Sequence, residues 1–258
     1  MDTFFQTKQY LKYRLTAGTE HDVHSPFVFD FINTILLDKT PFYAFEPIEA
    51  LRSKLLLSSE AISVLDLGAS RRTGTRRISE IAKSSLLPAK YGQMLFRMVN
   101  HFRPSAVLEL GTSLGITTLY LALPSRKTPV CTIEGSPEIA SVAQSGFGRL
   151  SCTNIESAVG DFSSELPRYL SSVSKIGLAF IDGNHRYGAT MDYFKACLEK
   201  QDDDSILIFD DINWSKEMAR AWKEISSNEK VTVSIDLFRM GIVFFRQGVP
   251  KQHFKLKF

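Results

Sequence analysis

The amino-acid sequence predicts an α/β protein with a mostly parallel β-sheet and a helical N-terminal extension. From Ser105 onward, short apolar runs alternate with amphipathic stretches of helical length. Strand–helix alternation of this kind joins parallel strands through right-handed crossovers. The last two apolar runs are separated only by Phe238 to Gly241, and so short a connection makes those two strands antiparallel.

Five strands are expected in the parallel part of the sheet. They are Ala106–Leu110, Val130–Ile133, Ile155–Val159, Ile176–Ile181 and Ser205–Phe209. The connecting segments Thr117–Leu123, Pro137–Ala143 and Arg186–Leu198 have the length and composition of helices. The C-terminal runs, Val231–Leu237 and Ile242–Phe245, follow as the antiparallel pair.

The first part of the chain has a different character. Apolar residues recur at helical spacing in four segments: Phe4–Leu15, Pro26–Leu37, Pro47–Leu57 and Ala89–Phe102. Prolines at positions 41, 47 and 88 punctuate them. We therefore divide the chain into a helical extension or cap, residues 1–89, and an α/β domain, residues 90–258.

Composition excludes several classes of protein. The 258 residues are 44% hydrophobic and 23% charged, which is ordinary for a globular protein and excludes disorder. A formal net charge of +3 does not indicate nucleic acid or an anionic membrane as the main partner. No apolar run approaches the roughly 20 residues of a membrane helix, and the three cysteines form no metal or redox pair. We expect a cytoplasmic protein with reduced thiols.

The most informative motif is the run from Val107 to Thr118, in which a buried strand enters a glycine turn and then a helix. Gly111 lets the backbone approach a ligand closely, and the helix start offers free N–H groups. The spacing to Gly115 is G-x-x-x-G. It is neither the dinucleotide fingerprint nor a phosphate loop, which disfavours a nicotinamide dehydrogenase.

Polar or glycine residues also follow the other strands. Glu134 ends the second strand, where an acid can accept both ribose hydroxyls of a nucleoside. Gly160, Asp161 and Phe162 follow the third strand, Asp182 the fourth, and Asp210 with Asp211 the fifth. Taken singly, each of these residues is explained equally well as a turn residue or a helix cap. Together they indicate a ligand site, because open parallel sheets bind ligands at the carboxyl ends of their strands.

These motifs resemble class I S-adenosylmethionine (SAM)-dependent methyltransferases over about residues 90 to 247. The resemblance implies a Rossmann-like sheet of seven strands in the order 3-2-1-4-5-7-6, with strand 7 antiparallel. It further implies that the glycine turn borders the methionine part of SAM, that Glu134 holds the ribose and that Asp161 with Phe162 lies at the adenine. The implied cofactor-binding residues are Glu109, Gly111, Thr112, Ser113, Gly115, Thr117, Glu134, Gly135, Ser136, Asp161, Phe162 and Asp182.

Two strings, Phe180 to Tyr187 and Ile208 to Ile212, resemble the catechol and caffeoyl-CoA type of small-molecule O-methyltransferase. By that resemblance Asp182, Asp210 and Asp211 would bind Mg²⁺, and His185 would replace the lysine base of the family. Asp211 departs from the pattern, since the family has an asparagine there. The alternatives are that Asp210 and Asp211 cap the next helix, that Asp182 contacts SAM alone, and that His185 orients the substrate.

Two weaker motifs stay open at the level of sequence. Val64 to Ala69 imitates the SAM turn, but an arginine-rich segment, Arg71 to Arg77, follows instead of an acid-ended strand. Those arginines suit a phosphorylated, CoA-linked or RNA substrate, or else a solvated loop. His21 and His24 have a metal-like spacing, yet a helix entry with Ser25 as N-cap and Pro26 behind it explains the segment more simply.

The sequence therefore predicts a SAM-dependent methyltransferase that acts on a small molecule, at a hydroxyl oxygen, with Asp182 and His185 as catalytic residues. A homodimer is expected from the resemblance. The alternatives are a methyltransferase of RNA or protein and a non-catalytic SAM-binding protein. The acceptor cannot be identified from the sequence, because the walls of its pocket come from loops and the extension.

Overall fold

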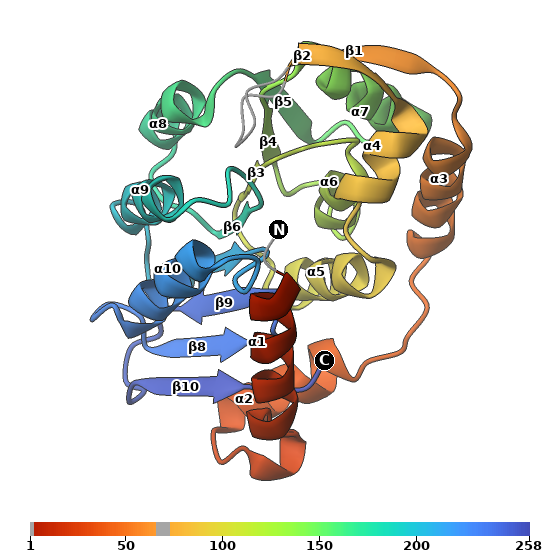
Figure 1. Cartoon of the computed structure of the whole chain (residues 1–258). Helices are drawn as coiled ribbons and strands as arrows, with labels where there is room; N and C mark the ends of the chain where they lie inside the picture. Colours follow the sequence, from red (N-terminus) through yellow and green to blue (C-terminus); the bar gives the residue numbers. More distant parts are fainter. Residues whose placement is uncertain (1–2, 66–72) are drawn as a thin grey trace. The chain divides into compact units, whose positions relative to one another are not determined.

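The structure, a computed structural model, describes residues 3–65 and 73–258 and divides into two compact units (Figure 1). Unit 1 combines residues 1–36 with residues 170–258, and unit 2 comprises residues 37–169. The predicted division at residue 89 separates helical segments from strand–helix alternation in the sequence. The compact units instead divide the chain after residues 36 and 169. The first 36 residues join the C-terminal part of the chain, so they do not form one extension with the segments that follow them.

Unit 2 contains three parallel strands: β3 (Val107–Leu110), β4 (Val130–Glu134) and β5 (Ile155–Val159). β4 lies between the other two, with Val107 opposite Val130 and Val130 opposite Ile155. Every residue of β3 is buried. The order and direction of these strands are those predicted for strands 1, 2 and 3.

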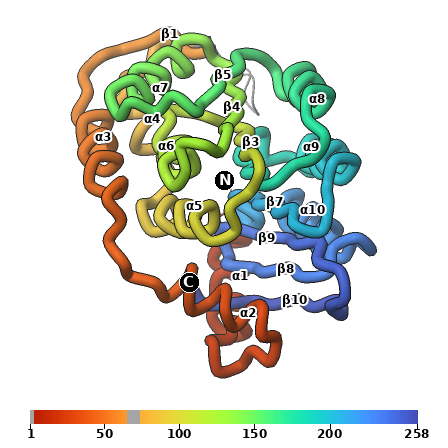
Figure 2. The backbone as a smooth tube through the Cα atoms, turned by 180° about the vertical axis from the view of Figure 1, so that it is seen from behind, coloured from red at the N-terminus to blue at the C-terminus, as the bar shows by residue number. Residues whose placement is uncertain are grey.

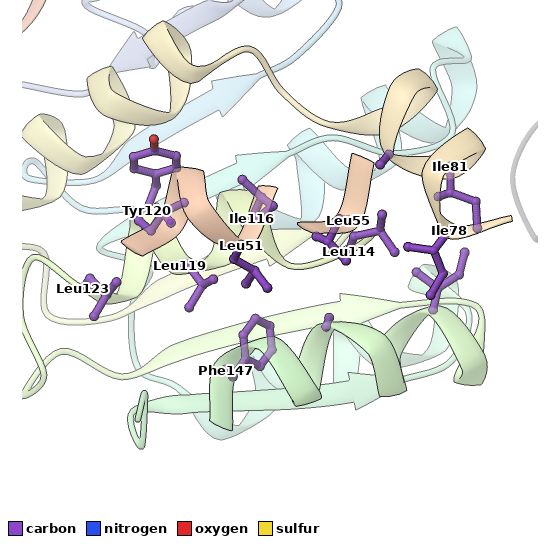
Figure 3. Close-up of a cluster of buried hydrophobic side chains, with 14 of the residues drawn as sticks. Leu51, Leu55, Ile78, Ile81, Leu114, Ile116, Leu119, Tyr120, Leu123 and Phe147 are labelled. Carbon is purple, nitrogen blue, oxygen red and sulfur yellow. The ribbon is translucent and has the colours of Figure 1, made fainter. Parts of the chain in front are cut away.

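Helices pack around this part of the sheet and share one apolar core. They are α3 (Phe45–Leu57), α4 (Ile78–Ser85), α5 (Ala89–Phe102), α6 (Ile116–Ala122) and α7 (Pro137–Arg149). A further helix, α8 (Phe162–Ser172), follows β5 and continues past the end of unit 2. Figure 3 shows the core, in which Leu51 of α3, Leu119 of α6 and Phe147 of α7 lie close together. The core thus fixes α6, the helix that follows the glycine turn.

A short antiparallel hairpin in unit 2 was not predicted. Strands β1 (Ala61–Leu65) and β2 (Thr73–Arg77) pair with Ala61 opposite Arg77, and the hairpin packs against α7. Val64 and Leu65, which begin the motif that imitates the SAM turn, are the last two residues of β1. Arg76 and Arg77 are exposed on β2, whereas Arg71, Arg72 and the segment Asp66–Gly68 lie outside the described residues.

Unit 1 contains β6 (Leu178–Ile181), β7 (Ile206–Phe209), β8 (Val233–Asp236), β9 (Gly241–Phe244) and β10 (Gln252–Lys255), in the order β10-β8-β9-β7-β6. β9 is antiparallel to both of its neighbours, as predicted for strand 7. Helices α9 (Tyr187–Leu198) and α10 (Lys216–Ser227) pack on each other. The predicted order and the Rossmann-like class are confirmed in each unit, and β10 is an additional strand parallel to β8.

The N-terminal helices of unit 1 are tied to its C-terminal strand. They are α1 (Thr3–Thr16), α2 (Pro26–Phe31) and the turns η1 (Glu20–Asp22) and η2 (Ile32–Leu36), the last being π-helical. The Tyr13 hydroxyl donates to the Leu256 carbonyl at 2.5 Å, and Gly18 forms a parallel bridge with Leu256. α1 and α2 accordingly lie beside the end of β10 in Figures 1 and 2.

None of the described helices has both the length and the apolar character required to cross a membrane. The three cysteines are unpaired: Cys131 and Cys197 are buried, and Cys152 is partly buried. Burial raises the pKa of the Cys131 and Cys197 thiols to about 12, with nearby carboxylates adding to the effect at Cys131, so these two thiols are protonated and unreactive at neutral pH.

The close approach of α5 and α6 generates a prediction about stability. A Cβ atom on Gly92 would lie 2.5 Å from the buried ring of Tyr120, whereas one on Gly148 of α7 would meet no atom of residues 3–65 and 73–258 within 4 Å. Gly92→Ala should therefore lower the free energy of unfolding by about 1–3 kcal/mol through overpacking. The matched Gly148→Ala should leave it unchanged or raise it by up to about 1 kcal/mol. Urea denaturation measures both, and equal shifts would contradict this packing.

Candidate cofactor and acceptor sites

The glycine turn of unit 2 begins directly after β3. Gly111 has a φ of 101°, and its N–H donates to the Ile133 carbonyl at 3.0 Å. Ser113, with a φ of 47°, also lies in the left-handed region, and so does Gly115 at 79°. Three left-handed residues within five positions fold the chain back sharply, so that α6 starts next to the end of β4.

Gly115 is required by packing as well as by its backbone angle. A Cβ atom here would lie 2.6 Å from Cε1 of Phe147 and 2.9 Å from the Cβ of Ala143, both on α7. The second glycine of the motif therefore sets how closely the start of α6 approaches α7. Its role in the structure is to position the turn, and a ligand contact is not needed to explain it.

Glu134 joins the turns that follow two neighbouring strands. Its Oε2 accepts the N–H of Ser113 at 2.8 Å, and its Oε1 accepts the N–H of Ser136 at 3.0 Å. The side chain is half-buried. Each carboxylate oxygen can accept a further hydrogen bond, so the pair remains suited to the two hydroxyls of a ribose.

Glu109 has a different environment from the one expected of a cofactor ligand. It is fully buried in β3, and its Oε2 accepts the hydroxyls of Thr118 at 2.5 Å and Thr132 at 2.6 Å. Thr132 is in turn hydrogen bonded to Thr112, at 2.5 Å between the hydroxyl oxygens. Glu109 thus supports the turn from within the core, and Thr117 on α6 is also almost fully buried.

Burial raises the pKa of Glu109 to about 8, the charge of Glu134 adds to this rise, and the hydrogen bonds from Thr118 and Thr132 oppose it. The carboxyl is therefore largely protonated at neutral pH. Its other oxygen, Oε1, is buried and has no hydrogen-bond partner among the described residues. A neutral carboxyl tolerates such a place far better than a charged one, since an unpaired buried charge is much more costly to desolvate.

The third predicted strand end, at Gly160 to Phe162, is anchored to the second. The Gly160 N–H donates to the Glu134 carbonyl at 2.9 Å. The Asp161 Oδ1 accepts the Ser163 N–H at 2.7 Å, so Asp161 caps the start of α8. Asp161 is exposed and Phe162 is partly exposed, which leaves both accessible to a ligand as well as structurally engaged.

In unit 1, the predicted acids stand at the ends of two adjacent parallel strands. Ile181 of β6 lies opposite Phe209 of β7, and the Asp210 N–H donates to the Ile181 carbonyl at 3.0 Å. Asp182 and Asp210 therefore begin neighbouring loops. Asp211 follows with a φ of 53°. The helix cap considered as an alternative for these acids is supplied instead by Ser215, whose hydroxyl accepts the Met218 N–H at 3.2 Å.

An arginine that the sequence analysis missed binds the second of these acids. Arg239, in the connection between β8 and β9, donates from Nε to the Asp210 Oδ1 at 3.0 Å and from Nη2 to Oδ2 at 2.7 Å. The same Nη2 lies 3.6 Å from the Asp211 Oδ1. One feature of the sequence could have indicated this contact. Arg239 lies in the short connection between the two antiparallel strands, which reaches this edge of the sheet.

These contacts bear on the predicted Mg²⁺ ligands. A divalent ion needs carboxylate oxygens whose lone pairs face it, but both oxygens of Asp210 already accept hydrogen bonds from Arg239. Among residues 3–65 and 73–258, no group of three or more His, Cys, Asp and Glu side chains is arranged to hold an ion. The predicted donor set therefore does not fit a metal as it stands in the structure.

His185 lies in the same loop as Asp182. Its Nε2 is 3.4 Å from the Asp182 Oδ1, and its ring centroid is 6.4 Å from that of Trp214. The preceding residue, Asn184, has a φ of 60° and a buried Oδ1 that no residue in the described part of the chain hydrogen bonds. A left-handed non-glycine residue and an unsatisfied amide next to the predicted base are features that proteins keep at functional positions.

The first helix contacts this cluster within unit 1. The Gln6 side-chain amide donates to the Trp214 carbonyl at 2.9 Å, and the rings of Tyr10 and Phe238 meet edge-on with centroids 5.1 Å apart. Phe238 precedes Arg239. The N-terminal segment is thus placed to form part of the surroundings of the predicted acceptor residues.

Residues 108–212 match the family model described as a methyltransferase domain. The match runs from β3 past β7 and includes the glycine turn, Glu134 and the predicted acids. It confirms the resemblance to class I SAM-dependent methyltransferases for this part of the chain. No curated protein matches the sequence significantly.

Solved structures show the same fold at low sequence identity. The O-methyltransferase of Bacillus cereus, crystallised with S-adenosylhomocysteine, is 17% identical with a TM-score of 0.58, over 84% of this chain and 97% of its own. The Streptomyces achromogenes O-methyltransferase TomG, in complex with SAM, is 18% identical with a TM-score of 0.56, over 62% and 82%. A Podospora anserina methyltransferase bound to S-adenosylhomocysteine is 14% identical, with a TM-score of 0.59, over 87% and 98%.

The buried Glu109 carboxyl predicts a pH-dependent stability. Its folded pKa, about 8, lies above its usual value of 4.5, so folding favours the protonated form. The resulting stabilisation is complete below the unfolded pKa and is lost as the pH rises toward 8, by up to about 1.4 kcal/mol per pH unit. Urea denaturation from pH 5 to pH 8 should show this loss in the wild type and a flatter profile in Glu109→Gln. Parallel profiles for the two proteins would contradict the assignment.

Proposed function

We propose that this protein is a SAM-dependent methyltransferase that transfers the methyl group to a hydroxyl oxygen of a small molecule. The observation that carries the proposal is the Glu134 carboxylate, held by the N–H groups of Ser113 and Ser136 beside the glycine turn. The methyltransferase-domain match over the same residues supports it. The solved O-methyltransferases with this fold support the choice of oxygen.

Different residues of unit 2 would contact the ribose, the methionine part and the adenine of SAM. Glu134 would accept the ribose hydroxyls, and the left-handed turn at Gly111 would let the methionine part approach the backbone. Asp161 and Phe162 would meet the edge and face of the adenine. Gly115, Glu109 and Thr117 would act indirectly, since all three residues are buried.

The residues of unit 1 suit the acceptor. SAM supplies a methyl group on a sulfonium sulfur, which makes the transfer an in-line displacement in which the acceptor must lose its proton. With the His185 Nε2 facing Asp182, the opposite nitrogen, Nδ1, would take the proton from the acceptor hydroxyl. Trp214 and the α1 segment would surround the acceptor, and the low net charge favours a small molecule over nucleic acid.

Two further expectations accompany this function. The unpaired cysteines support a reducing compartment, and we therefore propose a cytoplasmic location. A homodimer, as expected from the resemblance, stays a prediction that sedimentation or light scattering would test.

Glu134→Gln should weaken SAM binding by about 10- to 100-fold, because a charged acceptor for two hydroxyl donors is replaced by a neutral amide. Isothermal titration calorimetry with SAM measures the change, and a denaturation midpoint recorded alongside checks folding. Glu156→Gln, an exposed acid on β5, is the matched control and should bind as the wild type does. Absence of SAM binding by the wild type would remove the proposed function.

His185→Gln keeps a polar side chain near Asp182 but cannot accept a proton. Methyl transfer to phenolic acceptors, followed as S-adenosylhomocysteine release, should fall about 10²- to 10⁴-fold while the dissociation constant for SAM is unchanged. The exposed His24 provides the control variant, His24→Gln, which should retain full turnover. Near-full turnover of His185→Gln would exclude His185 as the base, and SAM binding without any turnover by the wild type would indicate a non-catalytic protein.

A further inference from the structure

The connection between β8 and β9 presents Arg239 to the acids after β7 through a rigid backbone. The Ile212 N–H donates to the Arg239 carbonyl at 3.0 Å, and the Asn213 side-chain amide donates to the Phe238 carbonyl at 2.8 Å. Phe238 itself is left-handed, with a φ of 67°. The arginine is therefore positioned by its loop, and its pairing with Asp210 is not an incidental surface contact.

The Arg239–Asp210 pair has the geometry of a strong ion pair. Two guanidinium nitrogens reach the two carboxylate oxygens, at 3.0 and 2.7 Å, and the Asp210 side chain is completely buried. Bidentate arginine–carboxylate pairs combine charge with fixed direction. Removing the arginine from such a pair would leave the buried charge of the carboxylate uncompensated. A metal ion that bound Asp210 would therefore have to displace Arg239.

Each of the three acids implied as Mg²⁺ ligands has a cationic or titratable nitrogen beside it. Arg239 binds Asp210 and lies 3.6 Å from Asp211, and His185 lies 3.4 Å from Asp182. The chain itself thus places a cationic side chain, Arg239, against Asp210 and beside Asp211.

We infer that the guanidinium of Arg239 takes the place of the divalent cation at this edge of the sheet, and that the protein binds no metal there. Arg239 is a positioning residue: it neutralises Asp210 and holds the loop after β7 against the connection between β8 and β9. The inference deepens the proposed function, on which its catalytic meaning rests.

A consequence for the acceptor follows from the difference between the two cations. A divalent ion with open coordination positions holds an acceptor by chelation, which favours two adjacent hydroxyl groups. A guanidinium already paired with Asp210 offers no such coordination. The acceptor of this protein therefore needs only one hydroxyl, directed at His185, and adjacent hydroxyl pairs give no advantage.

The test is the binding of Mn²⁺ alone to the full-length protein, measured by the loss of the free-ion electron paramagnetic resonance signal and by calorimetry. The wild type should bind no stoichiometric ion up to about 1 mM Mn²⁺, the weak limit of functional sites for hard cations. Arg239→Gln removes the charge and should gain at least about tenfold in Mn²⁺ affinity. Arg239→Lys, the matched control that keeps the charge, should behave as the wild type does.

Two results would overturn the inference. One is stoichiometric Mn²⁺ binding by the wild type that disappears in Asp210→Asn, which would show that the acids hold a metal despite the arginine. The other is a folded Arg239→Gln variant that gains no affinity for Mn²⁺, since the arginine would then not occupy a cation site. If Arg239→Gln does not fold, the wild-type and Asp210→Asn titrations still decide the question. These titrations contain no SAM. A result that overturns the inference about Arg239 is therefore distinguishable from a result that overturns the proposed methyltransferase function.

Discussion

The arrangement of unit 2 depends on the Glu134 carboxylate, which joins the turns after two neighbouring parallel strands. Parallel strands end at the same edge, so the turns after β3 and β4 each present backbone N–H groups that no strand partner can take. Glu134 accepts one N–H from each turn and so fixes the left-handed course of the glycine turn. Glu109 supports the same turn from the core through Thr118 and Thr132. A half-buried acid and a buried one thus perform different tasks on adjacent strands.

In unit 1, a different interaction stabilises two neighbouring acids. Asp210 and Asp211 follow a fully buried strand, where two carboxylates repel each other and lose hydration. A metal ion is one solution to this problem, and an arginine from an adjacent connection is another. Arg239 also ties two loops together, because its backbone carbonyl accepts the N–H of Ile212. The same residue therefore contributes to the electrostatics and to the shape of this edge.

Much of the fold was predictable because burial leaves a strong pattern in the sequence. Ala89–Phe102 was predicted with its observed bounds because a helical apolar stripe marks it, and the fully buried β3 lies within the predicted run Ala106–Leu110. The hairpin of β1 and β2 was missed, because β2 is polar and its residues 74–77 are all exposed, so they show no periodic burial. β10 was missed for a similar reason: its residues are mostly polar and none is fully buried, and it is identified by its pairing with β8.

The sequence by itself determined where the parallel strands lie and which residues stand at their carboxyl ends, because alternating apolar runs and glycine turns are local features. The order of the strands followed from the family resemblance. Only the tertiary structure decided that Glu109 is enclosed in the core, that residues 1–36 belong with the C-terminal strands, and that Arg239 neutralises Asp210. These facts depend on contacts between residues far apart in the chain. No local pattern records such a contact, since its stabilisation comes from charge and burial that exist only after the chain has folded.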